Sequence, residues 1–469
     1  MNIRAAMIRE AFHSPFAISH SQSRARGSVL IIVMWIAFGL VSIALYFGHA
    51  MLFEYRAAEE NAAGVAADEA IEGAARYLGY VLTNTTTIIQ PGQTTATEAY
   101  RCEAVPVGDA GFWLIGRADS TERRDVPFYK LVDEASKLNL NTATLDMLQM
   151  LPRMTPELAA AIVDWRDADD TVTTGGAESE TYGRRNPPYL CKNAKFDTLE
   201  ELHLVAGADR EILFGNDINL NGVLDPNEAS INNSAFSSTI RSGNVDPGLL
   251  EYLTVYSRQP NTGTNSSGLE IINVSDPGST NLQARLQEVF GQERAQQILA
   301  LVGASAATGF NSLLRFFLQS GMTPEEFGKI ADGLSVTNAA FTEGLVNVNT
   351  APAAVLACLP GIGGTDKADQ LVAYRRSNSS ELTSVAWVSK VLDQASELAV
   401  GPFITTRSYQ YSADVAALGP YGRGYRRTLF VFDTSQGDSK IVYRRDRSRL
   451  GWALGTETRQ PPFSGKELL

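Results

Sequence analysis

The hydrophobic positions of this chain form one uninterrupted apolar run followed by several periodic segments. Residues 28–53 contain no Asp, Glu, Lys or Arg, and this run exceeds the roughly 20 residues that a helix needs to cross a bilayer. In residues 54–82 apolar side chains recur at helical spacing, with acidic residues between them. The pattern predicts one long helix that spans a membrane and continues as an amphipathic helix to about Leu82. A separate second helix after a short turn is the alternative.

Segments with the composition of strands lie towards both ends of the remaining chain. Residues 93–133 contain three short apolar segments broken by Gly or Pro, and residues 401–469 contain three more. Helical sequence fills the region between them. We therefore expect an α+β fold in which the first and last strands meet in one sheet, interrupted by a large helical insertion.

An internal repeat lies within this insertion. Residues 139–166 and 347–375 both open with Asn-x-Asn-Thr-Ala and continue as a helix, a Leu-Pro turn and a second helix that ends in an aromatic residue and Arg. A fainter copy starts at Ile272. We expect these copies to be helix-hairpin-helix units of the SAM-like type. The expected limits of the first helix in each clear copy are the N-caps Thr142 and Thr350 and the helix breakers Pro152 and Pro360.

The residues before the apolar run resemble a processing signal. Arg24 and Arg26 precede Gly27, at the end of a weakly basic leader of residues 1–27, and their positive charge favours the cytoplasm for this end. A secretory signal would carry its cleavage site after the apolar run, whereas the RARG sequence lies before it. Cleavage between Gly27 and Ser28 would therefore leave the apolar helix on the mature protein. A plain single-pass anchor is the alternative.

The charge balance and the rare residues argue against several classes of function. The chain has 52 acidic and 40 basic residues, an excess that is unfavourable for binding a nucleic-acid backbone and favours cations as partners. Its three cysteines are widely spaced without a CxxC pattern, so no zinc motif is indicated. Outside the leader and the apolar run His203 is the one histidine, and no catalytic motif is present. We expect no enzyme.

One segment has the spacing of a calcium-binding EF-hand loop. The sequence DINLNGVLDPNE places oxygen-bearing residues at every ligand position and Gly222 at the turn. Calcium requires several oxygens to converge, and the alternate spacing of the first three side chains turns them inward. A polar turn without metal is the alternative. The candidate ligands are Asp217, Asn219, Asn221, the carbonyl of Val223, Asp225 and Glu228.

Several of these features together resemble the minor pseudopilin K family of type II secretion systems. They are the leader and anchor, the DWRDADD segment with the later GAE, the EELHLV helix, and the NVNTA hairpin before the last strands. Most pilin-like proteins carry Glu at the fifth mature position, whereas this chain has Ile32, as is typical of K-type subunits. The resemblance is weakest in residues 257–342, where the chain carries an extra helical segment.

The resemblance implies the function, the partners and a second calcium site. A K-type subunit is cleaved by prepilin peptidase, methylated, held in the bacterial inner membrane with its C-terminal domain in the periplasm, and joined by I-type and J-type minor pseudopilins at the pseudopilus tip. The implied calcium ligands are Asp167, Asp169 and Glu178; a solvated acidic helix end is the alternative.

Two other classes of protein share part of this pattern. A membrane-anchored DNA receptor would share the hairpins, and a type IV pilus minor pilin would share the leader. The division of the chain that we expect is a leader (1–27), a transmembrane segment (28–53), a continuing helix (54–82), the first part of the head (83–133), the inserted helical domain (134–250), an additional helical segment (251–345), the second hairpin unit (346–400) and the last strands of the head (401–469).

Overall fold

A computed structural model describes residues 26–84, 101–116, 127–229, 245–265, 268–275, 279–305, 309–455 and 458. Most of the predicted leader therefore lies outside the described residues. The chain divides into two compact units, residues 1–60 and 61–469, which are described separately below.

Helix α1 (Arg26–Thr83) is a single helix of 58 residues, so one long helix rather than two is confirmed. In the first unit of the chain this helix exposes large apolar side chains such as Val29, Leu40 and Phe53. The helix is long and apolar enough to cross a membrane. The backbone of Gly27 and Ser28 lies in its first turn.

The second unit contains an antiparallel sheet made from both ends of the described chain. Its strand order is β1-β2-β12-β13-β14, and β3 pairs with β12. The prediction that early and late strands meet is confirmed. The strands are β1 (Val105–Val107), β2 (Ala110–Ile115), β3 (Val132–Asp133), β12 (Gln410–Leu418), β13 (Arg426–Asp433) and β14 (Lys440–Asp446).

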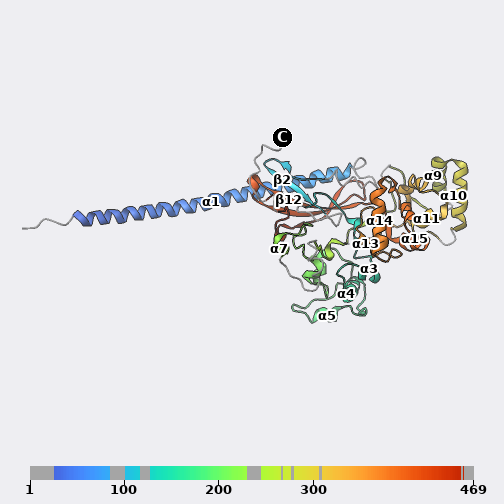
Figure 1. Cartoon of the computed structure of the whole chain (residues 1–469), viewed down its shortest axis with the longest axis horizontal. Coiled ribbons are helices and arrows are strands. Elements are labelled where there is room, and N and C mark those ends of the chain that lie inside the picture. Colours follow the sequence, from blue (N-terminus) through green and yellow to red (C-terminus); the bar gives the residue numbers. More distant parts are fainter. Residues whose placement is uncertain are drawn as a thin grey trace, which may run out of the picture. The chain divides into compact units, whose positions relative to one another are not determined.

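The last turns of α1 cover one face of this sheet (Figure 1). Ile71 and Leu78 are buried from the helix side, against Phe112 and Phe430 of the sheet. Burial of such side chains contributes about 1.5–3 kcal/mol each. The opposite face carries a smaller cluster that includes Leu454 from the end of the described chain.

Between β3 and β12 the chain forms three modules, each of which opens and closes on a pair of parallel two-residue strands. The pairs are β4 (Leu138–Asn139) with β5 (Leu253–Thr254) in the first module, β7 (Ile272–Asn273) with β8 (Leu334–Ser335) in the second, and β10 (Val346–Asn347) with β11 (Ile404–Thr405) in the third. A further pair, β6 (Arg258–Pro260) and β9 (Phe341–Glu343), joins the segments that flank the second module.

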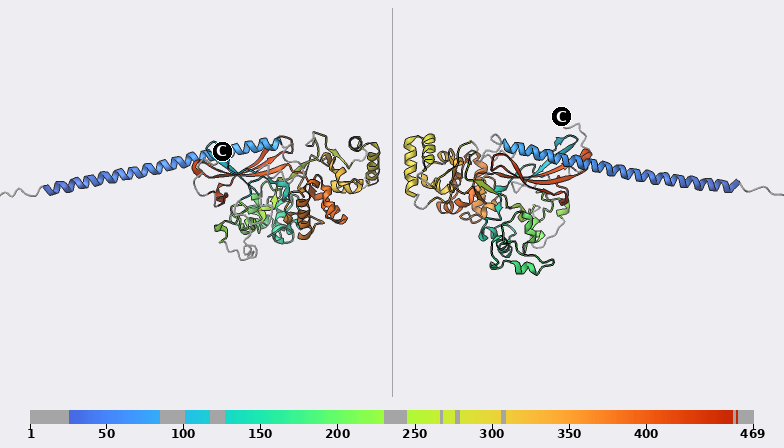
Figure 2. Two further views of the ribbon diagram at one scale, coloured as in Figure 1. Left: turned by 45° about the horizontal axis from the view of Figure 1, so that its top comes forward. Right: turned by 180° about the vertical axis from the view of Figure 1, so that it is seen from behind.

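Helices fill each module. In Figure 2 the adjacent helices α9 and α10 of the second module are yellow. The helices of the first module are α3 (Leu145–Gln149), α4 (Pro156–Arg166), α5 (Ser179–Gly183), the 3-10 helix η3 (Leu199–Leu204), α6 (Arg210–Phe214), α7 (Pro226–Ala229) and η4 (Leu249–Glu251); those of the second are α9 (Thr280–Phe290), α10 (Gln292–Ser305), α11 (Leu313–Ser320), α12 (Pro324–Gly328) and η6 (Ala331–Gly333); those of the third are α13 (Ala353–Ala357), α14 (Thr365–Ser377), η7 (Ser379–Glu381), η8 (Val385–Lys390), α15 (Gln394–Val400) and η9 (Gly401–Phe403).

The opening turn of each module uses an asparagine in the same way. The side-chain oxygens of Asn139, Asn273 and Asn347 each accept the backbone N–H two residues later at 2.9 Å. Two buried or half-buried arginines close the turns from the second helix: Arg166 donates to the carbonyls of Leu140 and Ala143, and Arg375 to those of Val348 (2.9 Å) and Ala351 (2.6 Å). The arginine that ends each copy of the sequence repeat is therefore a structural part of the turn.

The predicted N-caps Thr142 and Thr350 are wrong. Helix α3 is capped by Thr144, and α13 begins after Pro352. The asparagine turn explains the difference, because the carbonyl of Asn139 accepts the N–H groups of Thr142 and Ala143 and delays the helix.

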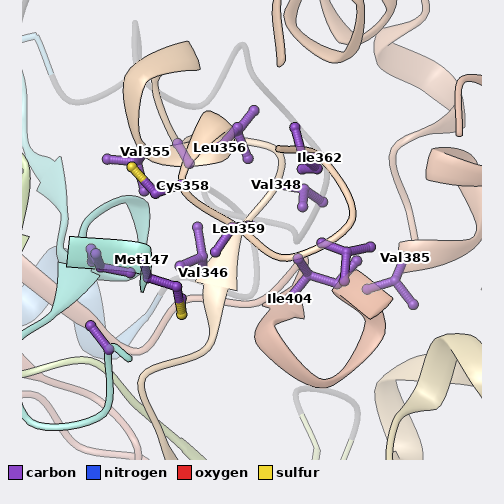
Figure 3. Packing of buried hydrophobic residues seen from close by; sticks show 14 of the residues in the cluster. Met147, Val346, Val348, Val355, Leu356, Cys358, Leu359, Ile362, Val385 and Ile404 are labelled. Atoms are coloured by element: carbon purple, nitrogen blue, oxygen red, sulfur yellow. The ribbon is translucent and has the colours of Figure 1, made fainter. Parts of the chain in front are cut away.

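The modules share one hydrophobic core. Figure 3 shows Met147 of the first module among the third module's Val346, Val355, Cys358 and Leu359, which belong to the same buried cluster.

Candidate cation sites

An acidic cluster lies between α4 and α5 in the first module. Asp164 is in the last turn of α4, Asp167 is the residue at its C-terminal end, and Glu178 directly precedes α5. One carboxylate oxygen from each of the three lies within 4.8 Å of the others. Asp164 and Glu178 are buried, with relative exposures of 0% and 2%. We call these three residues the acidic triad.

Three carboxylate oxygens of the triad have no hydrogen-bond donor among the described residues. Both carboxylate oxygens of Glu178 and Oδ1 of Asp167 are buried without a hydrogen-bond partner, whereas Asp164 accepts the N–H of Thr173 at 3.1 Å. Burial, reinforced by Asp164 and Asp167, raises the pKa of Glu178 to about 7. Burial also raises the pKa of Asp167. Converging carboxylate oxygens are the donor set that calcium prefers, so these residues fit a divalent cation.

The triad differs in one member from the ligands expected from the sequence. Asp167 and Glu178 meet, as expected, but Asp169 is exposed and its Oδ1 accepts the N–H of Thr171 at 2.8 Å. Asp164 takes the third place in the cluster. The spacing of Asp164 and Asp167, three residues apart at a helix end, is the sequence signal that could have identified it.

The predicted EF-hand-like loop is a second, separate candidate site, which ends on α7. The carboxylate of Asp217 accepts the N–H groups of Asn221 (3.0 Å) and Gly222 (2.8 Å), and Gly222 has φ +73°, which favours glycine. The carboxylate of Glu228 accepts N–H groups from both ends of the loop, those of Asn219 (3.2 Å) and Asp225 (3.0 Å). The first and last predicted ligands therefore define the loop conformation.

The candidate ligands in the middle of this loop form hydrogen bonds with one another. The amide NH₂ groups of Asn219 and Asn221 donate to Asp225 at 2.7 and 3.3 Å, while Oδ1 of Asn219 is buried without a partner. Val223 is buried, and its N–H donates to Asn221 at 2.8 Å. The donor set fits calcium, with amide oxygens as candidate ligands beside the carboxylates.

Burial also perturbs the acidic ends of the loop. It raises the pKa of Asp217 to about 7, with the charge of Glu228 adding to the effect. The pKa of Glu228 is raised as well, mainly by burial. A bound divalent cation would remove this unfavourable charge burial.

The hairpin turns of the first and third modules are engaged within the protein. Arg153 occupies the turn of the first module with φ +63° and donates to Asp246 (2.7 Å) and to the carbonyl of Glu211 (2.7 Å). In the third module a Cβ on Gly361 would lie 2.5 Å from the carbonyl oxygen of Ser396 in α15, whereas a Cβ on Gly363 or Gly364 would meet no atom within 4 Å. These contacts leave little access for a phosphate at Gly361.

The histidine and the three cysteines singled out in the sequence are not among the candidate ligands. His203 stacks on Phe214 at 5.9 Å between ring centroids. The three cysteines, Cys102, Cys191 and Cys358, are buried and unpaired, and burial raises the pKa of each thiol.

Part of the first module is similar to a known protein family. Residues 132–214, which contain the triad but not the EF-hand-like loop, match the family model for type II secretion system (T2SS) protein K. A curated relative, type II secretion system protein K of Klebsiella pneumoniae, is 38% identical over 68 residues, which are 14% of this chain and 21% of the relative. The match thus spans about a fifth of that relative's length.

One chain of a solved complex also aligns with this chain. The GspK–GspI–GspJ complex from the type 2 secretion system of enterotoxigenic Escherichia coli contains a chain that is 12% identical, with a TM-score of 0.35; the alignment covers 85% of this chain and 98% of that one. This TM-score does not establish a common fold. The family match confirms the resemblance predicted from the sequence: residues 132–214 match the family of type II secretion system protein K.

Proposed function

We propose that this chain is a minor pseudopilin at the tip of a type II secretion pseudopilus, where it starts filament assembly and supports protein export. The observation that carries the proposal is a protein K domain inserted into a head sheet against which the apolar N-terminal helix ends. This role is structural and requires no catalysis.

The inserted modules favour a position at the tip. The three modules contain most of the residues between β3 and β12. Without them the head consists of one sheet and one helix. A subunit stacked above such an insertion would clash with it, which makes an internal place in a helical filament unfavourable. The expected partners are the I-type and J-type minor pseudopilins, by analogy with the Escherichia coli complex.

Maturation by prepilin peptidase tests the anchor. We expect the mass of the membrane-extracted protein to show loss of residues 1–27 only in cells that contain the peptidase. Gly27→Ala should block this cleavage and secretion. Gly39→Ala is the matched control, because a Cβ at Gly39 would meet no atom within 4 Å and this position lies within the same helix. Processing of the Gly27→Ala protein at the normal rate would refute the leader assignment.

We further propose that the acidic triad and the EF-hand-like loop each bind one calcium ion in the periplasm. The buried oxygens without partners at both sites support this proposal. Calcium titration of the detergent-solubilised full chain should give two sites. D167N/E178Q should retain the loop site, and D217N/E228Q should retain the triad site. An unchanged number of sites in either double variant would refute that assignment.

Location in the inner membrane follows from the same proposal. Arg24 and Arg26, which precede the apolar run, would hold that end of the chain in the cytoplasm, so the second unit would face the periplasm. Protease added to spheroplasts should therefore digest residues 61–469, and protection of these residues would contradict the orientation.

A further inference from the structure

The EF-hand-like loop is bonded to the head sheet by one buried arginine, although the two are about 200 residues apart in sequence. Arg427, at the start of β13, is 0% exposed. It donates to the backbone carbonyl of Asn219 and, at 2.9 Å, to that of Leu220. Both carbonyls belong to the loop between Asp217 and Glu228, so the guanidinium holds the loop from outside.

The same arginine is fixed within the sheet. It makes two hydrogen bonds to the carboxylate of Asp414 on the neighbouring strand β12, at 2.8 and 2.7 Å. Arg447, after β14, donates to Asp414 at 2.7 Å. These bonds orient the guanidinium, because its planar group matches the carboxylate on one edge and the two carbonyls on another.

The loop also contacts the end of the described chain. Nδ2 of Asn219 donates to the carbonyl of Trp452 at 3.0 Å. The next two residues, Ala453 and Leu454, are buried against the face of the sheet that α1 leaves uncovered. Asn219 is therefore at once a candidate ligand, with its Oδ1 buried and unpartnered, and a contact to the head.

The charges of this network leave an excess that suits a divalent cation. Arg427 and Arg447 both bond to Asp414, and the loop adds three further carboxylates, which accept neutral N–H groups: those of Asp217, Asp225 and Glu228. The network therefore carries two more negative than positive charges when all groups are ionised. A divalent cation in the loop would balance them and lower the cost of burying the network.

We propose that cation binding in the EF-hand-like loop clasps the first module to the head sheet, with Arg427 as the positioning residue that couples the two. This inference rests on the proposed calcium binding by the loop. Linkage requires the coupling to be reciprocal: if calcium strengthens the contact between loop and sheet, an intact contact raises calcium affinity by the same factor.

Hydrogen–deuterium exchange of the full chain in detergent, with calcium or with chelator, tests the clasp directly. Calcium should slow exchange in residues 217–229 and also in residues 446–455 on the head side. Residues 365–377 in α14 are the internal reference and should not change. In D217N/E228Q both effects should disappear. Protection of the loop without protection of residues 446–455 would overturn the clasp while leaving the calcium site intact.

A matched pair of arginine variants tests the coupling. Arg427→Lys keeps the charge but cannot reach two carbonyls and both carboxylate oxygens at once, so calcium affinity of the loop should fall about tenfold, within the usual range of coupling between sites. Arg375→Lys is the control, because Arg375 is also buried and also donates to two turn carbonyls, far from the loop in sequence. It should leave loop affinity unchanged.

The outcomes separate the two proposals. Absence of calcium binding at the loop in the wild-type chain would refute the site and the clasp together. Unchanged loop affinity in R427K would refute only the coupling. The exchange experiment on the wild-type chain decides the question even if R427K does not fold.

Discussion

Replacing Glu178 by Gln should stabilise the calcium-free protein at alkaline pH, which is the opposite of the usual effect of changing a buried polar residue. The pKa of Glu178 is raised from 4.5 to about 7. In the absence of calcium its ionisation therefore costs nothing below about pH 4.5 and reaches its full cost above about pH 7. At 1.36 kcal/mol per unit, that cost is about 3 kcal/mol.

Urea unfolding, followed by tryptophan fluorescence, can measure this cost. Trp165 is a suitable reporter because it is buried beside the triad and packs on Tyr182 at 5.2 Å. In chelator, Glu178→Gln should raise the free energy of unfolding by up to about 3 kcal/mol at pH 8 and by little at pH 5. With calcium at 100 times its Kd, binding at the triad should raise the free energy of unfolding of the wild type by about 2.7 kcal/mol. The increase should be smaller in the variant.

Glu180→Gln is the matched control. Glu180 lies two residues away, is exposed, and pairs with the exposed Arg184, so its replacement should change neither the free energy of unfolding nor the calcium effect. A Glu178→Gln protein that is less stable than the wild type at pH 8 in chelator, and that keeps the full calcium effect, would refute the reasoning about the triad.

Two further variants test the surroundings of the triad and the first hairpin turn. Gly176→Ala would place a Cβ 2.0 Å from Oδ2 of Asp164; we expect a loss of about 1–3 kcal/mol in unfolding free energy and weaker calcium binding at the triad, measured by urea unfolding and calorimetry. Gly183→Ala, where a Cβ meets no atom within 4 Å, should change neither, and equal behaviour of the two would contradict the clash. Arg153→Ala removes the partner of the largely buried Asp246 and should cost about 2–4 kcal/mol, whereas Arg184→Ala at an exposed ion pair should have no measurable effect on the urea midpoint.

Features that depend on local periodicity could be predicted from the sequence. The apolar run and the amphipathic segment gave the full length of α1, because helical spacing persists across Phe53 without Pro or a glycine pair. The strands at both ends of the chain were recognisable as short apolar segments broken by Gly or Pro, and β2 and β12 do pair. Asp167 and Glu178 were identified through a family resemblance, and the structure brings them together.

Features that depend on long-range contacts could not be predicted in the same way. The closing strands β5, β8 and β11 are two residues long, too short for any periodicity to show. The turn that delays α3 and α13 combines a side-chain bond of asparagine with backbone bonds to the carbonyl of the same residue, and both compete with the helix. Arg427 stands in an ordinary strand sequence, and only the fold brings it to the loop.

The parallel strand pairs have a consequence for how such a chain changes in length. In each module the chain enters and leaves on hydrogen-bonded neighbours, which lie about 4.8 Å apart. A whole module can therefore be gained or lost while the points at which the chain enters and leaves it stay almost in place. The second module, residues 272–335, lies where the family resemblance is weakest, and its closed ends explain how the head can accommodate it without rearrangement of the sheet.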